Sequence, residues 1–223
     1  MDTITLFTSH GLDYLFRWGH FLAGITWIGL LYYFNFVQGE YFKEAEDAAR
    51  SNAVRKLVPR ALWWFRWGAM FTFLTGLAML HYRMGSISFD ITVGALLGTL
   101  MFLNVWLIIW PNQKIVIASA TQVADGGQAL PEAAAAAPKA ALASRTNTLF
   151  SLPMLFFMGS SAHMPNGMVS DAGMAELIVV LLIIAALQAN AIFGKQGPLT
   201  TVKGVIACGF GLTVVLYGLM VAL

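Results

Sequence analysis

The fold class follows from the stretch RWGHFLAGITWIG at residues 17–29. This stretch belongs to an apolar run long enough to cross a bilayer, which takes about 20 residues of helix. An arginine, Arg17, and a histidine, His20, lie inside the run. Ionisable side chains are costly within lipid and are candidates for function when they occur there. The stretch therefore predicts a membrane helix that carries part of a functional site.

The composition of the whole chain is that of an integral membrane protein. Hydrophobic residues make up 58% of the chain and charged residues 11%, with a mean hydropathy of +0.71, whereas soluble domains have roughly 45–50% and 25%. The net charge of +2 is too small to favour nucleic acid as a partner. The single cysteine, Cys208, excludes an intramolecular disulfide and a thiolate metal cluster.

Six apolar runs predict an all-α bundle of transmembrane helices that forms one membrane domain over residues 1–223. A short amphipathic surface helix is expected over residues 39–58, where Glu46 and Arg50 are spaced for an i,i+4 ion pair. Residues 125–144 are rich in alanine, with glycine and proline, and are predicted to be a linker. The six runs are residues 13–37, 60–82, 91–111, 146–163, 175–193 and 203–222.

Lysine and arginine are unevenly distributed over the predicted loops. The second and fourth loops hold only Arg83, whereas most of the 13 basic residues lie in or beside the first, third and fifth loops. Because basic loops favour the cytoplasm, both termini are expected on the exterior side of a bacterial inner membrane that the chain crosses several times. The basic residues in or beside the three odd-numbered loops are Lys43, Arg50, Arg55, Lys56, Arg60, Lys114, Lys139, Arg145, Lys195 and Lys203.

The histidines are expected to gather in the exterior half of the bundle. His10 precedes the first helix, His81 and His163 end later helices, and His20 lies about 10 Å deeper at ~1.5 Å per residue. One interpretation is that His20 and His81 hold a b-type haem or a metal ion, with Trp27 packed at the edge of the macrocycle. The alternative is that His20 is a packed polar residue bonded to a neighbouring helix and that His81 is an ordinary interfacial residue.

Arg17 lies three residues before His20 and so on roughly the same helix face. Its guanidinium would neutralise a haem propionate or an anionic substrate at the exterior surface. The alternative is that the side chain extends to lipid headgroups, as arginine does near helix ends.

A second polar group is predicted at the opposite, inner face. The third helix runs to Pro111, which releases the backbone and is followed directly by three polar residues. Two interpretations are open: a pocket for a quinone or an anion, or a helix cap with interface anchors. Asn35 and Gln38 of the first helix reach a similar level. The proposed inner polar site consists of Arg66, Asn112, Gln113 and Lys114.

Two motifs carry a resemblance to a known family. They are HFLAGITWIGLLYYFNFVQ at residues 20–38 and WPNQK at residues 110–114. Together they resemble the membrane domain of the bacterial membrane-bound urate oxidase (urate hydroxylase) family. The resemblance implies a multi-helix domain linked to purine breakdown, which in longer family members precedes a cytochrome c domain. More distantly, His20 followed by Trp27-x-Gly29 is similar to the membrane protoporphyrinogen oxidase family, where haem association is expected.

The 223 residues contain no Cys-x-x-Cys-His motif for attaching a c-type haem and no counterpart of the family's cytochrome domain. Two functions follow as expectations. The first is a redox or electron-transfer module that carries b-type haem and uses a separate cytochrome c as electron acceptor. The second is a non-catalytic accessory subunit that packs against other membrane proteins or further copies of itself.

Overall fold

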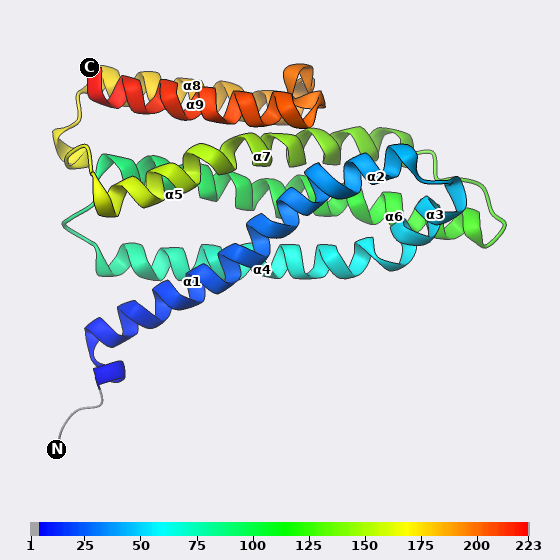
Figure 1. The fold of residues 1–223 in the computed structure, drawn as a ribbon, viewed down its shortest axis with the longest axis horizontal. Helices are drawn as coiled ribbons and strands as arrows, with labels where there is room; N and C mark the ends of the chain where they lie inside the picture. The colour runs from blue at the N-terminus through cyan, green and yellow to red at the C-terminus, as the bar shows by residue number, and fades with distance from the viewer. Residues whose placement is uncertain (1–4, 223) are drawn as a thin grey trace.

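The computed structural model describes residues 5–222, which form a bundle of long helices running along a common axis (Figure 1). The ends of the expected domain, residues 1–4 and residue 223, lie outside the described residues. No strand occurs within residues 5–222, which confirms the all-α class. The α-helices are α1 (Ser9–Tyr32), α2 (Gly39–Glu44), α3 (Asp47–Lys56), α4 (Val58–Tyr82), α5 (Phe89–Leu103), α6 (Trp110–Ala124), α7 (Ala133–His163), α8 (Met174–Phe193) and α9 (Val202–Ala222).

Four helical segments are long and apolar enough to cross a membrane, so this is a multi-pass membrane protein. Two of them are joined rods of 36 residues, Ser9–Glu44 and Phe89–Ala124, and the other two are α8 and α9. Within the rods, six-residue π-helical segments link the α-helices: η2 (Tyr33–Gln38) joins α1 to α2, and η3 (Asn104–Ile109) joins α5 to α6.

Pro111 does not end the third helix, which differs from the expectation. The proline is the second residue of α6, inside a helical rod that continues from α5 through η3. The π-helical segment η3 directly precedes it and provides the looser turn that fits the proline ring. The backbone therefore continues as a helix to Ala124 and carries the motif at residues 110–114 within a rigid element.

The linker expected over residues 125–144 is shorter than that range, because α7 begins at Ala133. Alanine is the best helix former, and the small side chains let α7 pack closely on α6. Ala136, Ala140 and Ala143 are buried in this packing. The surface helix expected over residues 39–58 occurs as two helices, α2 and α3, rather than one.

Amides at the centre of the bundle form a buried polar cluster. Asn104 of η3 donates to Asn147 of α7 over 2.9 Å and exchanges hydrogen bonds with Gln188 of α8. Asn147 in turn donates to the carbonyl of Met101 over 2.9 Å. Because buried amides are stable only when paired, these bonds fix the relative depth of η3, α7 and α8.

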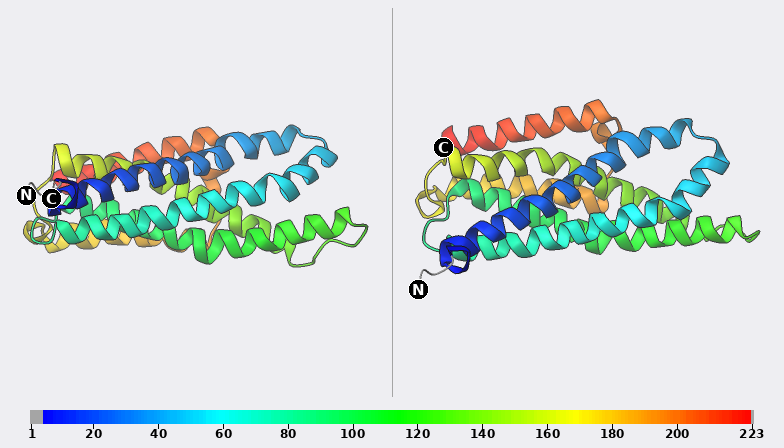
Figure 2. Two further views of the ribbon diagram at one scale, coloured as in Figure 1. Left: turned by 90° about the horizontal axis from the view of Figure 1, so that it is seen from below. Right: turned by 60° about the horizontal axis from the view of Figure 1, so that its bottom comes forward.

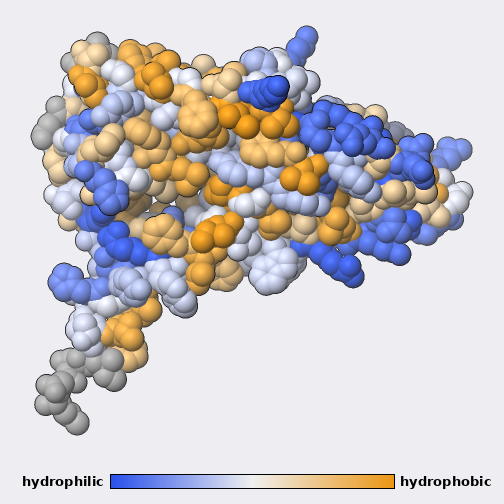
Figure 3. Space-filling view, in the orientation of Figure 1, coloured by the Kyte–Doolittle hydropathy of each residue, from blue (hydrophilic) through white to orange (hydrophobic). Residues whose placement is uncertain are grey.

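Helices α8 and α9 are 20 and 21 residues long, which matches the thickness of a bilayer. Figures 1 and 2 show that α4, α6 and α7 continue past one end of this pair, where α2 and α3 cover them. We call this part, made of residues 39–57 and 113–145, the polar end. Hydrophilic residues gather on it in the space-filling view (Figure 3). The start of α1 and the end of α9 lie at the opposite end of the bundle.

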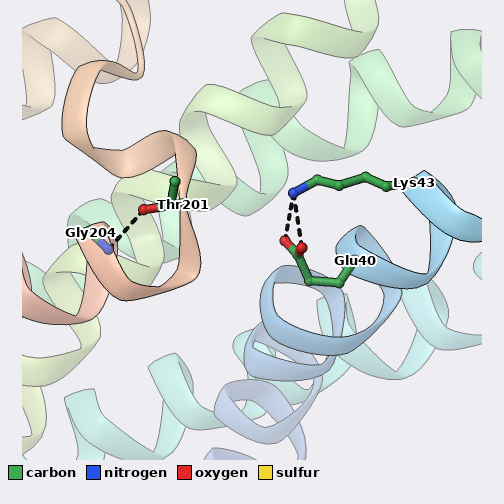
Figure 4. Close-up of polar contacts among 4 residues, drawn as sticks. All are labelled: Glu40, Lys43, Thr201 and Gly204. Carbon is green, nitrogen blue, oxygen red and sulfur yellow. Dashed lines mark hydrogen bonds and ion pairs between the residues drawn. The ribbon is translucent and has the colours of Figure 1, made fainter.

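Two local polar contacts lie near the junction between the polar end and the apolar helices (Figure 4). Lys43 of α2 forms an ion pair with Glu40 over 2.8 Å. The hydroxyl of Thr201 accepts from the backbone N–H of Gly204 over 3.0 Å, which caps the start of α9. Lys43 thus has its charge matched within its own helix.

Candidate functional site

A cavity of about 570 Å³ lies where the polar end meets η2, the first turns of α4 and the end of η3. Its walls come from the continuous segments η2–α2 and η3–α6 and from α3, α4 and α7. The inner wall is apolar and includes Leu62, Phe65 and Ile109, and the rest of the lining mixes apolar and polar residues. The polar lining residues are Asn35, Gln38, Asp47, Arg50, Ser51, Gln113, Ser144 and Arg145.

Arg145 is the dominant charge of this cavity. It lies on α7, six residues after the exposed Lys139, and is only 8% exposed. Its Nη1 atom is buried and has no hydrogen-bond partner among residues 5–222, nor does the side chain form an ion pair there. A buried guanidinium nitrogen without an acceptor is unfavourable, which makes Arg145 a candidate to bind an acceptor group of a ligand.

Gln38 supplies the complementary group. Its Oε1 atom is also buried and lacks a donor in the described part of the chain. Two residues that line the cavity therefore each carry a buried polar atom, one a cationic donor and one an amide acceptor, without a partner in the described residues. A ligand that fits both has an anionic or carbonyl oxygen beside an N–H or O–H group.

The π-helical segment η2 sets the direction of Gln38. Asn35, within the same segment, donates to the carbonyl of Leu31 and to Oγ of Ser144, each over 2.8 Å. These bonds fasten η2 to α7 beside Arg145. π-Helical turns often occur at functional sites because they redirect side chains that a regular helix would place elsewhere.

The four residues of the expected inner polar site are not brought together as one group. Gln113 lines the cavity. Asn112 donates to the carbonyl of Ile108 over 2.7 Å and so serves its own helix. Arg66 and Lys114 instead meet at the ring of Trp110, with Arg66 Cζ 3.3 Å and Lys114 Nζ 5.5 Å from the ring centroid.

His20 packs directly against α4. Its Nδ1 atom lies 3.1 Å from Oγ1 of Thr75. A Cβ added to Gly76 would lie 3.3 Å from Cε1 of the histidine ring. His20 thus makes the contact with a neighbouring helix that the packing interpretation expects, and Nε2 is the ring nitrogen left for another partner.

His81 is exposed, and its ring contacts that of Tyr82, with the ring centroids 6.0 Å apart. It follows Thr75 by six residues and projects from a different face of α4. His20 thus contacts α4 at a different level from His81, and a haem held by this pair stays a prediction. The described residues contain no group of three or more metal-ligating side chains.

Two further residues of the expected cofactor site have local roles. Arg17 pairs with Asp13, one turn earlier, through bonds of 2.8 and 3.2 Å. The i,i+4 spacing of these two residues is visible in the sequence and indicates this pair. Trp27 is 2% exposed in the contact between α1 and α4, and its Nε1 has no acceptor among the residues described.

Arg145 lies inside α7 and is buried, although the sequence predicts a basic loop at this point, after the linker. The sequence feature that indicates a buried polar position here is the run Ser-Arg-Thr-Asn-Thr at residues 144–148. These five polar residues come directly before an apolar stretch. Such a run within a helix is costly unless its side chains are buried against polar partners.

Comparison with known proteins gives one match. A family model described as "Urate oxidase N-terminal" matches residues 85–220. The match includes WPNQK and Arg145, whereas the motif at residues 20–38 precedes it. No curated protein and no solved structure matches the chain. The matched residues cover more than half of the 223 residues and run from the turn before α5 through most of α9. The chain therefore belongs to the urate oxidase N-terminal family.

Proposed function

We propose that the chain is the substrate-binding membrane module of a urate-oxidising complex. The cavity of the polar end binds urate or a closely related purine, and a separate cytochrome c is the final electron acceptor. Membership of the urate oxidase N-terminal family supports the class of substrate. Membership of this family also supports a role in oxidation.

The unpaired atoms of Arg145 and Gln38 carry the proposal. Urate is a flat anion at neutral pH, with carbonyl oxygens and N–H groups along its edges. A guanidinium binds such an edge through charge-assisted hydrogen bonds, and the amide oxygen accepts from a ring N–H. The apolar wall at Phe65 and Ile109 offers a surface for the flat ring.

Oxidation of a purine requires water as the source of oxygen and an acceptor for the electrons that are released. Oxidation with water adds one oxygen atom to the purine and releases two electrons and two protons. Two molecules of ferric cytochrome c, each a one-electron acceptor, balance the reaction. In this chain Arg145 holds the anion, and Gln38 and Asn35 orient it within the cavity.

We further propose six membrane crossings with both termini on the exterior side of a bacterial inner membrane, in line with the basic odd-numbered loops. The polar end then faces the cytoplasm. An exterior cytochrome c would be separated from the cavity by a bilayer about 30 Å thick. The electrons therefore need a redox centre between the two, and another subunit of the complex provides it.

Urate binding to the purified chain in lipid nanodiscs tests this function. We expect a saturable heat signal in isothermal titration that weakens at least about tenfold in Arg145→Gln, since one charge-assisted hydrogen bond contributes about 1.5–3 kcal/mol. Gln38→Leu is the second variant and removes only the acceptor. Lys139→Gln, an exposed position on the same helix, is the matched control.

Failure of the wild-type chain to bind urate would contradict the substrate role. Co-purification with other membrane proteins, without urate binding, would then favour the non-catalytic accessory subunit. Urate-dependent reduction of cytochrome c by membranes that hold the whole complex tests the redox step, and Arg145→Gln is expected to abolish it.

A further inference from the structure

A cluster of cations and indoles lies outside the cavity, where the apolar helices meet the polar end. It consists of Arg66 of α4, Trp106 of η3, and Trp110 and Lys114 of α6. The guanidinium of Arg66 stacks on Trp110, with Cζ 3.3 Å from the ring centroid, and lies 5.9 Å from the centroid of Trp106. Lys114 Nζ lies 5.5 Å from the same Trp110 ring. Two positive charges from different helices thus share one indole.

The donors of this cluster lack acceptors. Arg66 uses Nε for the carbonyl of Leu62 over 3.2 Å, and its two Nη groups bond to nothing among the described residues. Neither Arg66 nor Lys114 has a carboxylate partner in residues 5–222. Trp106 Nε1 is buried and has no acceptor there either. Stacking on an indole holds a guanidinium flat and leaves its Nη donors directed outward in the ring plane.

The position of the cluster indicates the source of the missing acceptors. Three exposed tryptophans of α4, Trp63, Trp64 and Trp67, lie beside Arg66 and are 47%, 60% and 38% exposed. Exposed tryptophans are typical of the level of the lipid headgroups. Arg66 and Lys114 therefore lie at the depth of the phosphates of one leaflet.

We propose that Arg66 and Lys114, oriented by Trp110, form a specific site for the phosphate group of an anionic phospholipid. The phosphate accepts from the two Nη groups of Arg66 in a bidentate manner, and Lys114 contributes a second positive charge. The cations disfavour a zwitterionic headgroup, because its quaternary amine would approach Lys114. The site is separate from the cavity and does not depend on urate binding.

Thermal unfolding of the delipidated full-length protein in detergent tests the site. The probes are dioctanoyl phosphatidylglycerol, dioctanoyl phosphatidylcholine and inorganic phosphate. We expect phosphatidylglycerol to raise the midpoint temperature saturably in the wild type and phosphatidylcholine to have much less effect. Arg66→Gln is expected to weaken the apparent affinity for phosphatidylglycerol at least about tenfold. Lys203→Gln, an exposed lysine at the start of α9, is the charge-matched control and should behave as wild type.

Several outcomes separate the alternatives. Equal responses of the wild type and Arg66→Gln to phosphatidylglycerol would overturn the proposal, as would the lack of any response to all three probes. An Arg66-dependent response to inorganic phosphate alone would support the phosphate site but identify a free anion as its occupant. Arg66→Lys keeps the positive charge, and it replaces Arg66→Gln in the binding test if Arg66→Gln does not fold. It is expected to bind with intermediate affinity because the flat stacking on Trp110 is lost.

Discussion

Asn104 of η3 and Gln188 of α8 exchange two side-chain hydrogen bonds, 3.0 Å and 2.7 Å long. In the described part of the chain, this pair makes the only side-chain hydrogen bonds between α8 and another helix. Most of the α8 surface is otherwise exposed or half-buried. The pair therefore fixes the depth and rotation of a helix that apolar contacts alone would hold loosely.

Replacing Gln188 by leucine is expected to lower the free energy of unfolding by about 1–2 kcal/mol, because Asn104 loses one donor and one acceptor partner. Thermal unfolding in nanodiscs measures this change. Gln128→Leu alters an exposed glutamine in the loop before α7 and is the control. An unchanged midpoint for Gln188→Leu would show that the amide pair does not hold α8.

Gly68 permits the close crossing of α1 and α4. A Cβ added there would lie 3.1 Å from the backbone N of Trp27 and 3.3 Å from the carbonyl O of Ala23, so α1 would have to move. Gly68→Ala is expected to destabilise the protein by about 1–3 kcal/mol. Gly24→Ala, where nothing lies within 4 Å, should be neutral or slightly stabilising, because alanine favours a helix. Equal effects of the two changes would argue against this close crossing.

Asp90 joins the loops at the end of the bundle opposite the polar end. It is fully buried, and it accepts from Ser160 Oγ over 2.5 Å and from the backbone N–H of Asn166 over 2.7 Å. Asp90→Ala is expected to cost about 2–3 kcal/mol and to expose residues 164–173 to proteases. Limited proteolysis followed by mass spectrometry measures the exposure. Asp13→Ala removes a half-exposed carboxylate and should leave the cleavage pattern unchanged.

The two histidines of the expected haem site are expected to respond differently. His81→Ala should leave the stability and the visible spectrum of the purified protein unchanged, since His81 is exposed and its ring contacts that of the neighbouring Tyr82. His20→Ala should lower the midpoint of unfolding, because Thr75 loses its partner across the contact of α1 and α4. A reduced-minus-oxidised spectrum with a b-type band that His81→Ala abolishes would contradict this arrangement.

Much of the fold was predictable because lipid requires continuous apolar helices. The observed α4, α8 and α9 nearly coincide with the runs 60–82, 175–193 and 203–222. The polar end was less predictable, since its hydrophilic surface follows no such rule. There the alanine-rich start of α7 resembles a linker, although packing on α6 makes it a helix.

The candidate site was predictable only in part. Gln38, Gln113 and Asn35 were recognised as polar residues at one level of the bundle, and the cavity does contain them. Arg145 was expected in a loop, because its burial depends on how separate helices pack against α7. Whether a buried atom lacks a partner is a property of tertiary packing, which no local pattern of residues specifies.

The lengths of α8 and α9 have a consequence for the choice of ligand. These two helices stop before the polar end, so under the proposed topology of six crossings the cavity opens on the aqueous side of the bilayer. A ligand reaches it without partitioning into oil. Among purine analogues of similar shape, affinity should therefore follow the arrangement of hydrogen-bonding groups and be independent of octanol solubility.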